Sequence, residues 1–277
     1  MNDVDLGQVF TNKSVAEYMT SLFCLSNDCK ILDPCFGEGA FIAALLNHGY
    51  QSVEGYEIDA SLYCAVREKY PNLRLHNRDF LTTNSKNSYD GIIMNPPYIR
   101  QEKINHLAGY GITKKALRKL KLYDALPSTA NLYMYFIVKA IDLLQPEGEL
   151  VVIFPSSWLN ARSGQFFKEY LYSKCTLLQQ VHISGEVFEK NALVEVVILK
   201  LQKGASLDVL PIVKHIDVQN GALIQKENDK ESVNLGFKMH FNAIAKVRRG
   251  LTTGYNKMFI NPPLTDEESK THFKEIL

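Results

Sequence analysis

The stretch Tyr89-Asp90-Gly91-Ile92-Ile93-Met94-Asn95-Pro96-Pro97-Tyr98 decides how this sequence is interpreted. Its first six residues are a short apolar run, which predicts a buried strand. The two prolines end that strand, because neither can donate a hydrogen bond to a neighbouring strand. Pro97 also restricts Pro96 to an extended conformation. We therefore expect the Asn95 amide and the Pro96 carbonyl side by side at the carboxyl end of the strand, where open parallel sheets bind ligands.

This pair offers two hydrogen-bond acceptors to one amino group. An exocyclic amino group on a purine is a poor nucleophile, because its lone pair is delocalised into the ring. If the Asn95 side-chain oxygen and the Pro96 carbonyl each accept one N–H, the nitrogen becomes pyramidal and its lone pair faces an electrophile. Tyr98 can stack on the ring, and no strong base is needed. The alternative interpretation is a tight turn with an incidental aromatic residue.

Two upstream segments have features of a nucleotide site. Residues 30–33 predict a strand that runs into a loop with Gly37 and Gly39, which allow a ligand close to the backbone, and then into an apolar helix. Residues 53–59 predict a second strand, with Glu57 close to where such folds place a carboxylate on ribose hydroxyls. The full dinucleotide glycine pattern is absent, so we expect a ligand without a pyrophosphate.

Two further segments are open to two interpretations. Asp79-Phe80 follows a predicted strand at residues 73–76, and the pair can bind a planar base or simply form a turn with a core phenylalanine. Near the amino terminus, Ser14-Val15-Ala16-Glu17 has the pattern of a capping box and predicts a helix that begins near Ser14. That helix terminus suits a carboxylate, but it is equally an ordinary amphipathic helix.

The second half of the chain continues the alternation of strands and helices. Residues 99–129 read as an inserted, locally basic loop, which is either a solvated face or a contact for phosphates. The remaining predicted elements are a helix at 131–144, a strand at 150–154, a helix at 163–172 and an antiparallel strand pair at 177–183 and 194–199. We therefore predict an α/β fold, doubly wound, with a mostly parallel sheet and an antiparallel carboxy-terminal hairpin. The expected domains are 1–203, catalytic, and 204–277, a strand pair, a linker and the beginning of a target-recognition region.

Composition sets broad limits on function. The 277 residues carry a net charge of +1, with 46% hydrophobic and 22% charged residues, so any polyanion site must be a local patch. The acidic start lacks the features of a signal peptide, and no apolar run is long enough to span a membrane. The five cysteines are scattered without zinc-ligand spacing, so we expect no metal and a reducing cytoplasm.

Taken together, these stretches resemble the gamma-class DNA adenine-N6 methyltransferases of restriction–modification systems. The resemblance covers about residues 7–201 and rests on the order of the motifs: Phe10-Thr11, the 33–41 loop, Glu57, Asp79-Phe80, Asn95–Tyr98, the 131–144 helix and Phe188. It implies S-adenosylmethionine as the methyl donor and double-stranded DNA with a flipped adenine as the substrate. It also leaves room for a cognate restriction endonuclease or a separate specificity region as partner.

The resemblance also implies a role for each motif. Thr11 and the 33–39 loop would hold the methionine part of the cofactor, Glu57 its ribose, and Asp79 its adenine amino group, with Phe80 and Phe136 on either side of the ring. Phe188 would close on the target adenine. The implied cofactor-binding residues are Thr11, Asp33, Cys35, Gly37, Gly39, Phe41, Glu57, Ile58, Asp79, Phe80, Asn95 and Phe136. The implied catalytic residues are Asn95, Pro96, Pro97, Tyr98 and Phe188.

The sequence departs from the family pattern at Asn12, where proline usually follows the threonine, so the first helix can begin differently. Residues 247–259 resemble only the entry into a target-recognition domain, so we expect sequence recognition to come from further chain or from a partner. The nearest rival functions are methylation of a protein glutamine or of ribosomal RNA. A rival of another class is a non-catalytic subunit that binds cofactor and DNA, which the complete Asn95–Tyr98 quartet argues against.

Overall fold

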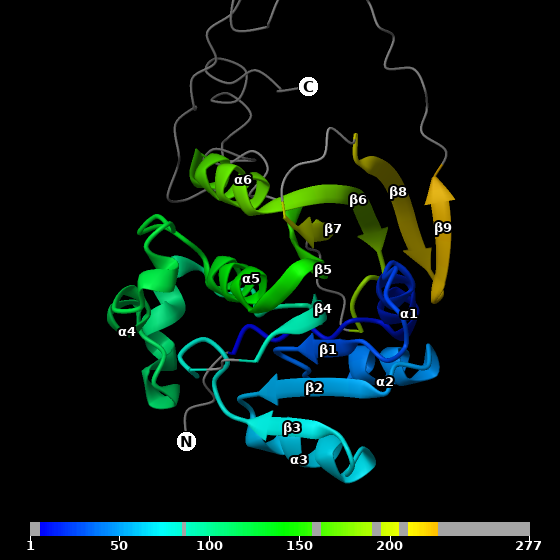
Figure 1. Cartoon of the computed structure of the whole chain (residues 1–277), viewed down its shortest axis with the longest axis horizontal. Helices are drawn as coiled ribbons and strands as arrows, with labels where there is room; N and C mark the ends of the chain where they lie inside the picture. Colours follow the sequence, from blue (N-terminus) through cyan, green and yellow to red (C-terminus); the bar gives the residue numbers. More distant parts are fainter. Residues whose placement is uncertain (1–5, 85–86, 157–161, 190–194, 205–209, 227–277) are drawn as a thin grey trace, which may run out of the picture. The chain divides into compact units, whose positions relative to one another are not determined.

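The fold is a nine-stranded sheet with helices on both faces, seen here in a computed structural model (Figure 1). The structure describes residues 6–84, 87–156, 162–189, 195–204 and 210–226, which belong to one compact unit, Met1–Asn228. The strand order is β3-β2-β1-β4-β5-β7-β6-β8-β9. The predicted recognition-domain entry at 247–259 lies outside the described residues.

The first five strands are parallel and confirm the predicted doubly wound arrangement. They are β1 (Lys30–Asp33), β2 (Ser52–Glu57), β3 (Arg74–Asn77), β4 (Tyr89–Met94) and β5 (Leu144–Pro155). The chain proceeds outward from β1 to β3 and then returns to place β4 on the other side of β1. This reversal opens a crevice at the carboxyl ends of β1 and β4, which is where such sheets bind ligands.

The other end of the sheet contains the antiparallel strands. The predicted hairpin is confirmed, because β7 pairs antiparallel with both β5 and β6. Beyond it, β8 pairs parallel with β6 and antiparallel with β9, which is the peripheral strand pair expected after residue 203. The bounds are β6 (Cys175–Gly185), β7 (Val196–Lys203), β8 (Ile212–Gln219) and β9 (Ala222–Lys226).

Alternating strand residues separate two apolar cores. In β4, Ile92 and Met94 join the core that contains α5 and α6, whereas Ile93 joins the core that contains α1 and α2. This alternation follows from the two-residue repeat of a strand that is covered on both faces. The helices are α1 (Lys13–Ser21), α2 (Ala40–Asn47), α3 (Ala60–Lys69), α4 (Lys114–Arg118), α5 (Leu132–Leu143) and α6 (Arg162–Lys174). No helix in the described part of the chain is long and apolar enough to cross a membrane.

The first helix begins one residue before the predicted Ser14. Asn12 is its N-cap, and the Asn12 side-chain oxygen accepts a hydrogen bond from the Ser14 backbone N–H at 3.2 Å. The predicted capping box is therefore wrong. Glu17 does not reach back to Ser14 but accepts hydrogen bonds on α2, from Asn47 at 2.8 Å. Asparagine replaces the family's proline as the residue that starts the helix.

The inserted segment 99–129 is not a loop. It contains the 3₁₀ helix η1 (Gln101–Tyr110), α4 and the 3₁₀ helix η2 (Lys121–Tyr123). Ile104, Leu117 and Tyr123 are buried in the same core as α5. The prediction failed because these helices are short and their apolar residues are too few to show a clear helical repeat.

The strand β5 begins earlier than the predicted residue 150, with no connecting loop after α5. The strand begins at Leu144, directly after the helix, so Pro146, Glu147 and Gly148 lie within it. The register between β4 and β5 shifts between Tyr89 and Gly91, and Glu147 has a φ of 65°. These residues therefore form an irregularity at the start of the strand.

Candidate active site

Asn95 follows the end of β4 and is held by the amino-terminal segment. Its side-chain nitrogen donates hydrogen bonds to the Val9 carbonyl at 2.7 Å and to the Thr11 hydroxyl at 3.0 Å. These two bonds fix the orientation of the amide, because only the nitrogen can donate. The side-chain oxygen is buried and has no hydrogen-bond partner. A buried acceptor without a partner is costly, so it marks a position prepared for a donor.

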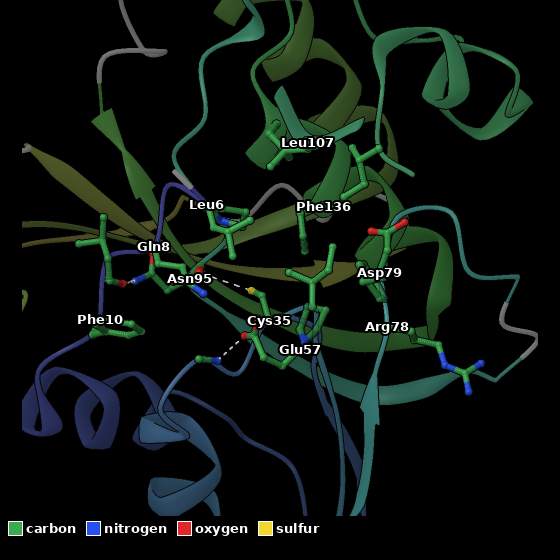
Figure 2. Close-up of a pocket in the computed structure, with 18 residues that line it drawn as sticks. Leu6, Gln8, Phe10, Cys35, Glu57, Arg78, Asp79, Asn95, Leu107 and Phe136 are labelled. Carbon is green, nitrogen blue, oxygen red and sulfur yellow. Dashed lines mark hydrogen bonds between the residues drawn. The ribbon is translucent and has the colours of Figure 1, made fainter. Parts of the chain in front are cut away.

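The backbone around Asn95 is fixed as well. The Cys35 thiol donates to the Asn95 carbonyl at 3.4 Å, and the Tyr98 N–H donates to the Gly7 carbonyl at 3.1 Å. Figure 2 shows this bond as a dashed line between Cys35 and Asn95. Pro96 is buried and Pro97 lies at the pocket wall. The asparagine and the two prolines are thus held rigidly, as electrostatic preorganisation requires.

Tyr98 and Phe188 lie side by side although they are distant in sequence. Their ring centroids are 6.0 Å apart at an interplanar angle of 75°. The Tyr98 hydroxyl donates to the Ile153 carbonyl at 3.5 Å, and Thr11 and Phe188 form an isolated antiparallel bridge. Burial raises the pKa of Tyr98 well above its ordinary value, so the hydroxyl stays protonated. The structure therefore brings the amino-terminal segment, Tyr98 and Phe188 together.

The loop after β1 carries the two glycines in left-handed conformations. Gly37 has a φ of 52° and Gly39 a φ of 83°, and Gly39 is the N-cap of α2. Both angles are strained for residues with a side chain. The Gly37 N–H donates to a carboxylate oxygen of Glu57 at 2.8 Å. This hydrogen bond therefore fixes the loop against the end of β2.

Glu57 is almost fully buried, and each of its oxygens accepts a hydrogen bond. Besides the Gly37 bond, the other oxygen accepts from the Asp59 N–H at 2.9 Å. Each carboxylate oxygen retains a second lone pair, and Glu57 lines a pocket together with Cys35 and Gly37. Burial raises its pKa, and the backbone N–H bonds oppose that shift. Glu57 is thus fixed and still able to accept from a ligand hydroxyl.

Asp79 forms a turn of its own at the end of β3. One oxygen accepts from the Leu81 N–H at 2.9 Å, and the other accepts from the Thr82 N–H at 2.8 Å and from the Thr82 hydroxyl at 2.5 Å. The carboxylate also lines the pocket, as Figure 2 shows. The turn interpretation is confirmed, and binding of a planar base by Asp79 and Phe80 stays a prediction.

Phe80 and Phe136 do not lie on either side of a ring-sized gap. Their centroids are 5.6 Å apart at 27°, so the two rings stack on each other. A base between them would need a separation of about 7 Å, which is two stacking distances of about 3.5 Å. In this conformation the arrangement that the resemblance implied is wrong. The stacked pair instead forms one apolar wall of the pocket.

Asp33 lies behind the glycine loop and is fully buried. One of its oxygens accepts from the Cys35 N–H at 3.3 Å, and the other has no hydrogen-bond partner. Burial raises the pKa of this carboxyl to about 8. Burial also raises the pKa of the Cys35 thiol well above its ordinary value. Both groups are therefore neutral at pH 7.

Most of the predicted residues line two pockets that share Cys35, Gly37 and Asn95. The first is largely apolar, and the predicted residues that line it are Cys35, Gly37, Glu57, Ile58, Asp79, Phe80, Asn95, Pro97 and Phe136. The second adds Thr11, Gly39 and Phe41. Asp33, Pro96, Tyr98 and Phe188 line neither of these two pockets.

Several lining residues had no signal in the sequence. Leu6, Gln8 and Val9 reach the first pocket from the amino-terminal segment, and Leu107, Ile112 and Leu132 reach it from the insert and the start of α5. Arg78 also lines this pocket, although its side chain extends outward in Figure 2. These contacts depend on segments that are far apart in the chain. The order Phe10-Thr11 was the one hint that the amino terminus participates.

Comparison with known proteins shows which sequences this chain is similar to. A family model described as the Eco57I restriction-modification methylase matches residues 50–188. The type II methyltransferase M.HincII of Haemophilus influenzae is 28% identical over 76% of this chain, and M.AccI of Acinetobacter calcoaceticus is 29% identical over 91%. M.TthHB8I of Thermus thermophilus is 30% identical over 72% of the chain. The chain spans 40%, 52% and 45% of the length of these three relatives.

Solved structures share the fold at low sequence identity. A type I restriction–modification methyltransferase subunit of Streptococcus thermophilus has a TM-score of 0.60 at 18% identity, covering 83% of this chain and 53% of that one. A protein assigned to the class I S-adenosylmethionine-dependent methyltransferases, from Listeria monocytogenes, has a TM-score of 0.59 at 17% identity, covering 74% and 65%.

The sheet order places this chain in the class of mostly parallel α/β folds that these solved methyltransferase structures share. Within this class, the match to half of the chain identifies the family. The chain belongs to the Eco57I restriction-modification methylase family.

Proposed function

We propose that this chain transfers a methyl group from S-adenosylmethionine to the N6 amino group of adenine in DNA. The observation that carries the proposal is the oriented Asn95 side chain, with its nitrogen bound to Val9 and Thr11 and its oxygen buried without a partner. That oxygen has the chemistry to accept an N–H from an amino group. Such an acceptor beside the Pro96 carbonyl would explain why the amide is held by two bonds.

The residues present fit the cofactor. Glu57 is fixed by two backbone N–H groups and keeps free lone pairs for ribose hydroxyls. The Phe80–Phe136 wall and Asp79 suit an adenine ring and its amino group, with the ring against the wall rather than between the phenylalanines. Thr11 and the glycine loop, which line the second pocket, suit the methionine part. When bound, S-adenosylmethionine supplies an electrophilic methyl group.

The chain's own residues would activate the target nitrogen. The Asn95 oxygen and the Pro96 carbonyl accept its two N–H groups and turn its lone pair toward the methyl group. Tyr98 packs against the base, and Phe188, whose ring contacts Tyr98, supports that packing. The nitrogen would take the methyl group as the methyl–sulfur bond breaks and the donor leaves as a neutral thioether, and the methylated nitrogen would lose one proton to solvent. No group in the described site needs to act as a strong base.

Two features favour DNA as the substrate. The relatives are methyltransferases named for type II systems, and the family is one of restriction–modification methylases. In addition, the insert carries seven basic residues against two acidic ones, Glu102 and Asp124, and Leu107 and Ile112 from the same insert line the pocket. A basic surface beside the pocket would hold phosphates while the adenine is flipped out of the duplex. A restriction endonuclease or a separate specificity region is the partner that this function calls for.

The test is methyl transfer from labelled S-adenosylmethionine to DNA, ribosomal RNA and protein, followed by nucleoside and amino-acid analysis. We expect N6-methyladenine in DNA. N4-methylcytosine would keep the enzyme class but change the base. Label in a protein glutamine or in ribosomal RNA would support the rival methyltransferases, and cofactor binding without transfer to any substrate would support a non-catalytic subunit.

A further inference from the structure

A buried lysine in α5 is tied to the loop that carries Asp79 and Phe80. Lys139 is 5% exposed and lies in a helix that is otherwise almost entirely apolar. Its ammonium nitrogen donates to the carbonyl oxygens of Phe80 at 2.5 Å, Leu81 at 3.1 Å and Thr83 at 2.5 Å. An ammonium group has three N–H donors, so the loop after β3 takes all of them.

Burial of the charged Lys139 side chain costs free energy that an apolar residue would not cost, and a role in holding the loop after β3 would explain why a lysine is present. Burial lowers the pKa of Lys139 to about 8, and the carboxylates of Asp79 and Asp142 oppose that shift. The third titratable group beside it is Tyr123 of η2, whose hydroxyl donates to the Leu81 carbonyl at 2.9 Å. Lys139 is therefore largely charged at pH 7, and three backbone carbonyls replace its water. An apolar residue at this position would fill the core without any desolvation cost.

The same lysine lies against the aromatic wall of the pocket. Its nitrogen is 4.9 Å from the centroid of the Phe80 ring. Phe136, one turn earlier on α5, stacks on the same ring at 5.6 Å. Residues three apart on a helix share a face, so α5 holds the Phe80 ring with Phe136 and the Phe80 backbone with Lys139.

We propose that Lys139 is a positioning residue for the adenine half of the cofactor site. It acts through Phe80 and the loop that begins at Asp79, and it touches neither the substrate nor the reacting atoms. The proposal rests on the proposed function, because it assumes that Phe80 and Asp79 receive the cofactor's adenine. A purely structural lysine would stabilise the fold equally but would leave cofactor affinity unchanged.

The experiment compares Lys139→Met with Lys203→Met by calorimetric titration with S-adenosylmethionine and with adenosine. Lys203 is the control, because its ammonium group also donates to backbone carbonyls but does not contact the loop after β3. Its acceptors lie at the α5–β5 junction, the carbonyl of Asp142 at 3.1 Å and that of Leu144 at 2.6 Å. We expect Lys139→Met to weaken both ligands about tenfold, the fold-change for 1.4 kcal/mol. We expect Lys203→Met to leave both affinities unchanged. In both variants, kcat at saturating cofactor should change little.

The outcomes separate this inference from the proposed function. If the wild-type chain binds neither ligand, the proposed function fails. The positioning role is wrong if the wild type binds and Lys139→Met binds equally well. This comparison is made when Lys139→Met and Lys203→Met lose a similar amount of melting temperature. If Lys139→Met does not fold, the wild type is titrated with adenosine from pH 7 to pH 10 beside Lys139→Arg. Affinity should weaken above about pH 8 in the wild type and not in Lys139→Arg, and equal profiles would overturn the inference.

Discussion

Replacement of Asn95 tests the proposed chemistry most directly. Asn95→Ala removes the acceptor for the target amino group and also the two bonds from its side-chain nitrogen to Val9 and Thr11. At about 0.5–1.5 kcal/mol for each hydrogen bond, the variant loses about 1–3 kcal/mol of stability. For a domain of this size, that loss lowers the melting temperature by roughly 2–4 °C per kcal/mol. Loss of one preorganised polar contact lowers kcat by about 10²–10³-fold.

The assay is single-turnover methylation of an adenine-containing duplex at saturating cofactor, with cofactor affinity measured by calorimetry. We expect the rate to fall at least a hundredfold while the affinity stays within about twofold to threefold of wild type. A rate within about threefold of wild type would refute the role of the Asn95 oxygen. A loss of cofactor affinity that matches the loss of rate would instead assign Asn95 to the cofactor site.

Asn95→Asp sharpens the test. The aspartate keeps an acceptor but places a second oxygen 2.7 Å from the Val9 carbonyl, where the wild-type amide donates. A protonated carboxyl can donate to Val9 and still offer its other oxygen to the target amine. We therefore expect the rate of this variant, relative to wild type, to rise as pH falls. A constant ratio across pH would mean that orientation by Val9 and Thr11 does not matter.

Four further predictions follow from the site. Glu57→Ala should weaken binding of S-adenosylmethionine by about 1–3 kcal/mol in calorimetry, because a carboxylate acceptor and the anchor of the Gly37 N–H are lost together; unchanged affinity would remove Glu57 from the site. Tyr98→Phe should cost little activity and Tyr98→Ala much, since packing against the base survives only in the first; equal losses would show that the hydroxyl matters. Burial raises the pKa of Asp33 to about 8, so between about pH 4 and pH 8 the folded state keeps a proton that the unfolded state has released. The free energy of unfolding measured in urea should therefore fall as pH rises through that window, and Asp33→Asn should flatten its dependence on pH. Lys115→Gln and Lys119→Gln should each reduce the slope of log affinity for DNA against log salt by about one if both lysines contact phosphates, and an unchanged slope would exclude them.

Much of the fold could be predicted because its signals are local. The apolar run at Tyr89–Met94 and the two prolines after it gave the bounds of β4, and the residues of β1 were equally plain. The glycine loop and Glu57 were both assigned to a nucleotide site, and the structure shows that the Gly37 hydrogen bond joins them, which the sequence did not predict. A strand end, a turn and a left-handed glycine are each determined by a few adjacent residues, so one sequence displays them.

The helices of the insert and the stacking of Phe80 on Phe136 could not be predicted from local sequence. Short helices with few apolar residues carry no clear repeat, so residues 101–123 read as a loop. The resemblance placed Phe80 and Phe136 at the same ring but could not show that they stack on each other. Packing between side chains 56 positions apart is decided by how α5 lies against the sheet, and no pattern within either segment encodes it.

The sequence by itself determined which groups are available: an amide after the central strand, acids at the strand ends, and glycines in the loop. The tertiary structure alone decided how these groups are oriented. Val9 and Thr11, 86 and 84 residues from Asn95, hold its nitrogen and leave its oxygen without a partner. Lys139, 59 residues from Phe80, fixes the loop after β3. Residue type follows from the chain, whereas the direction of a hydrogen bond depends on which distant segment the folded sheet brings within about 3 Å.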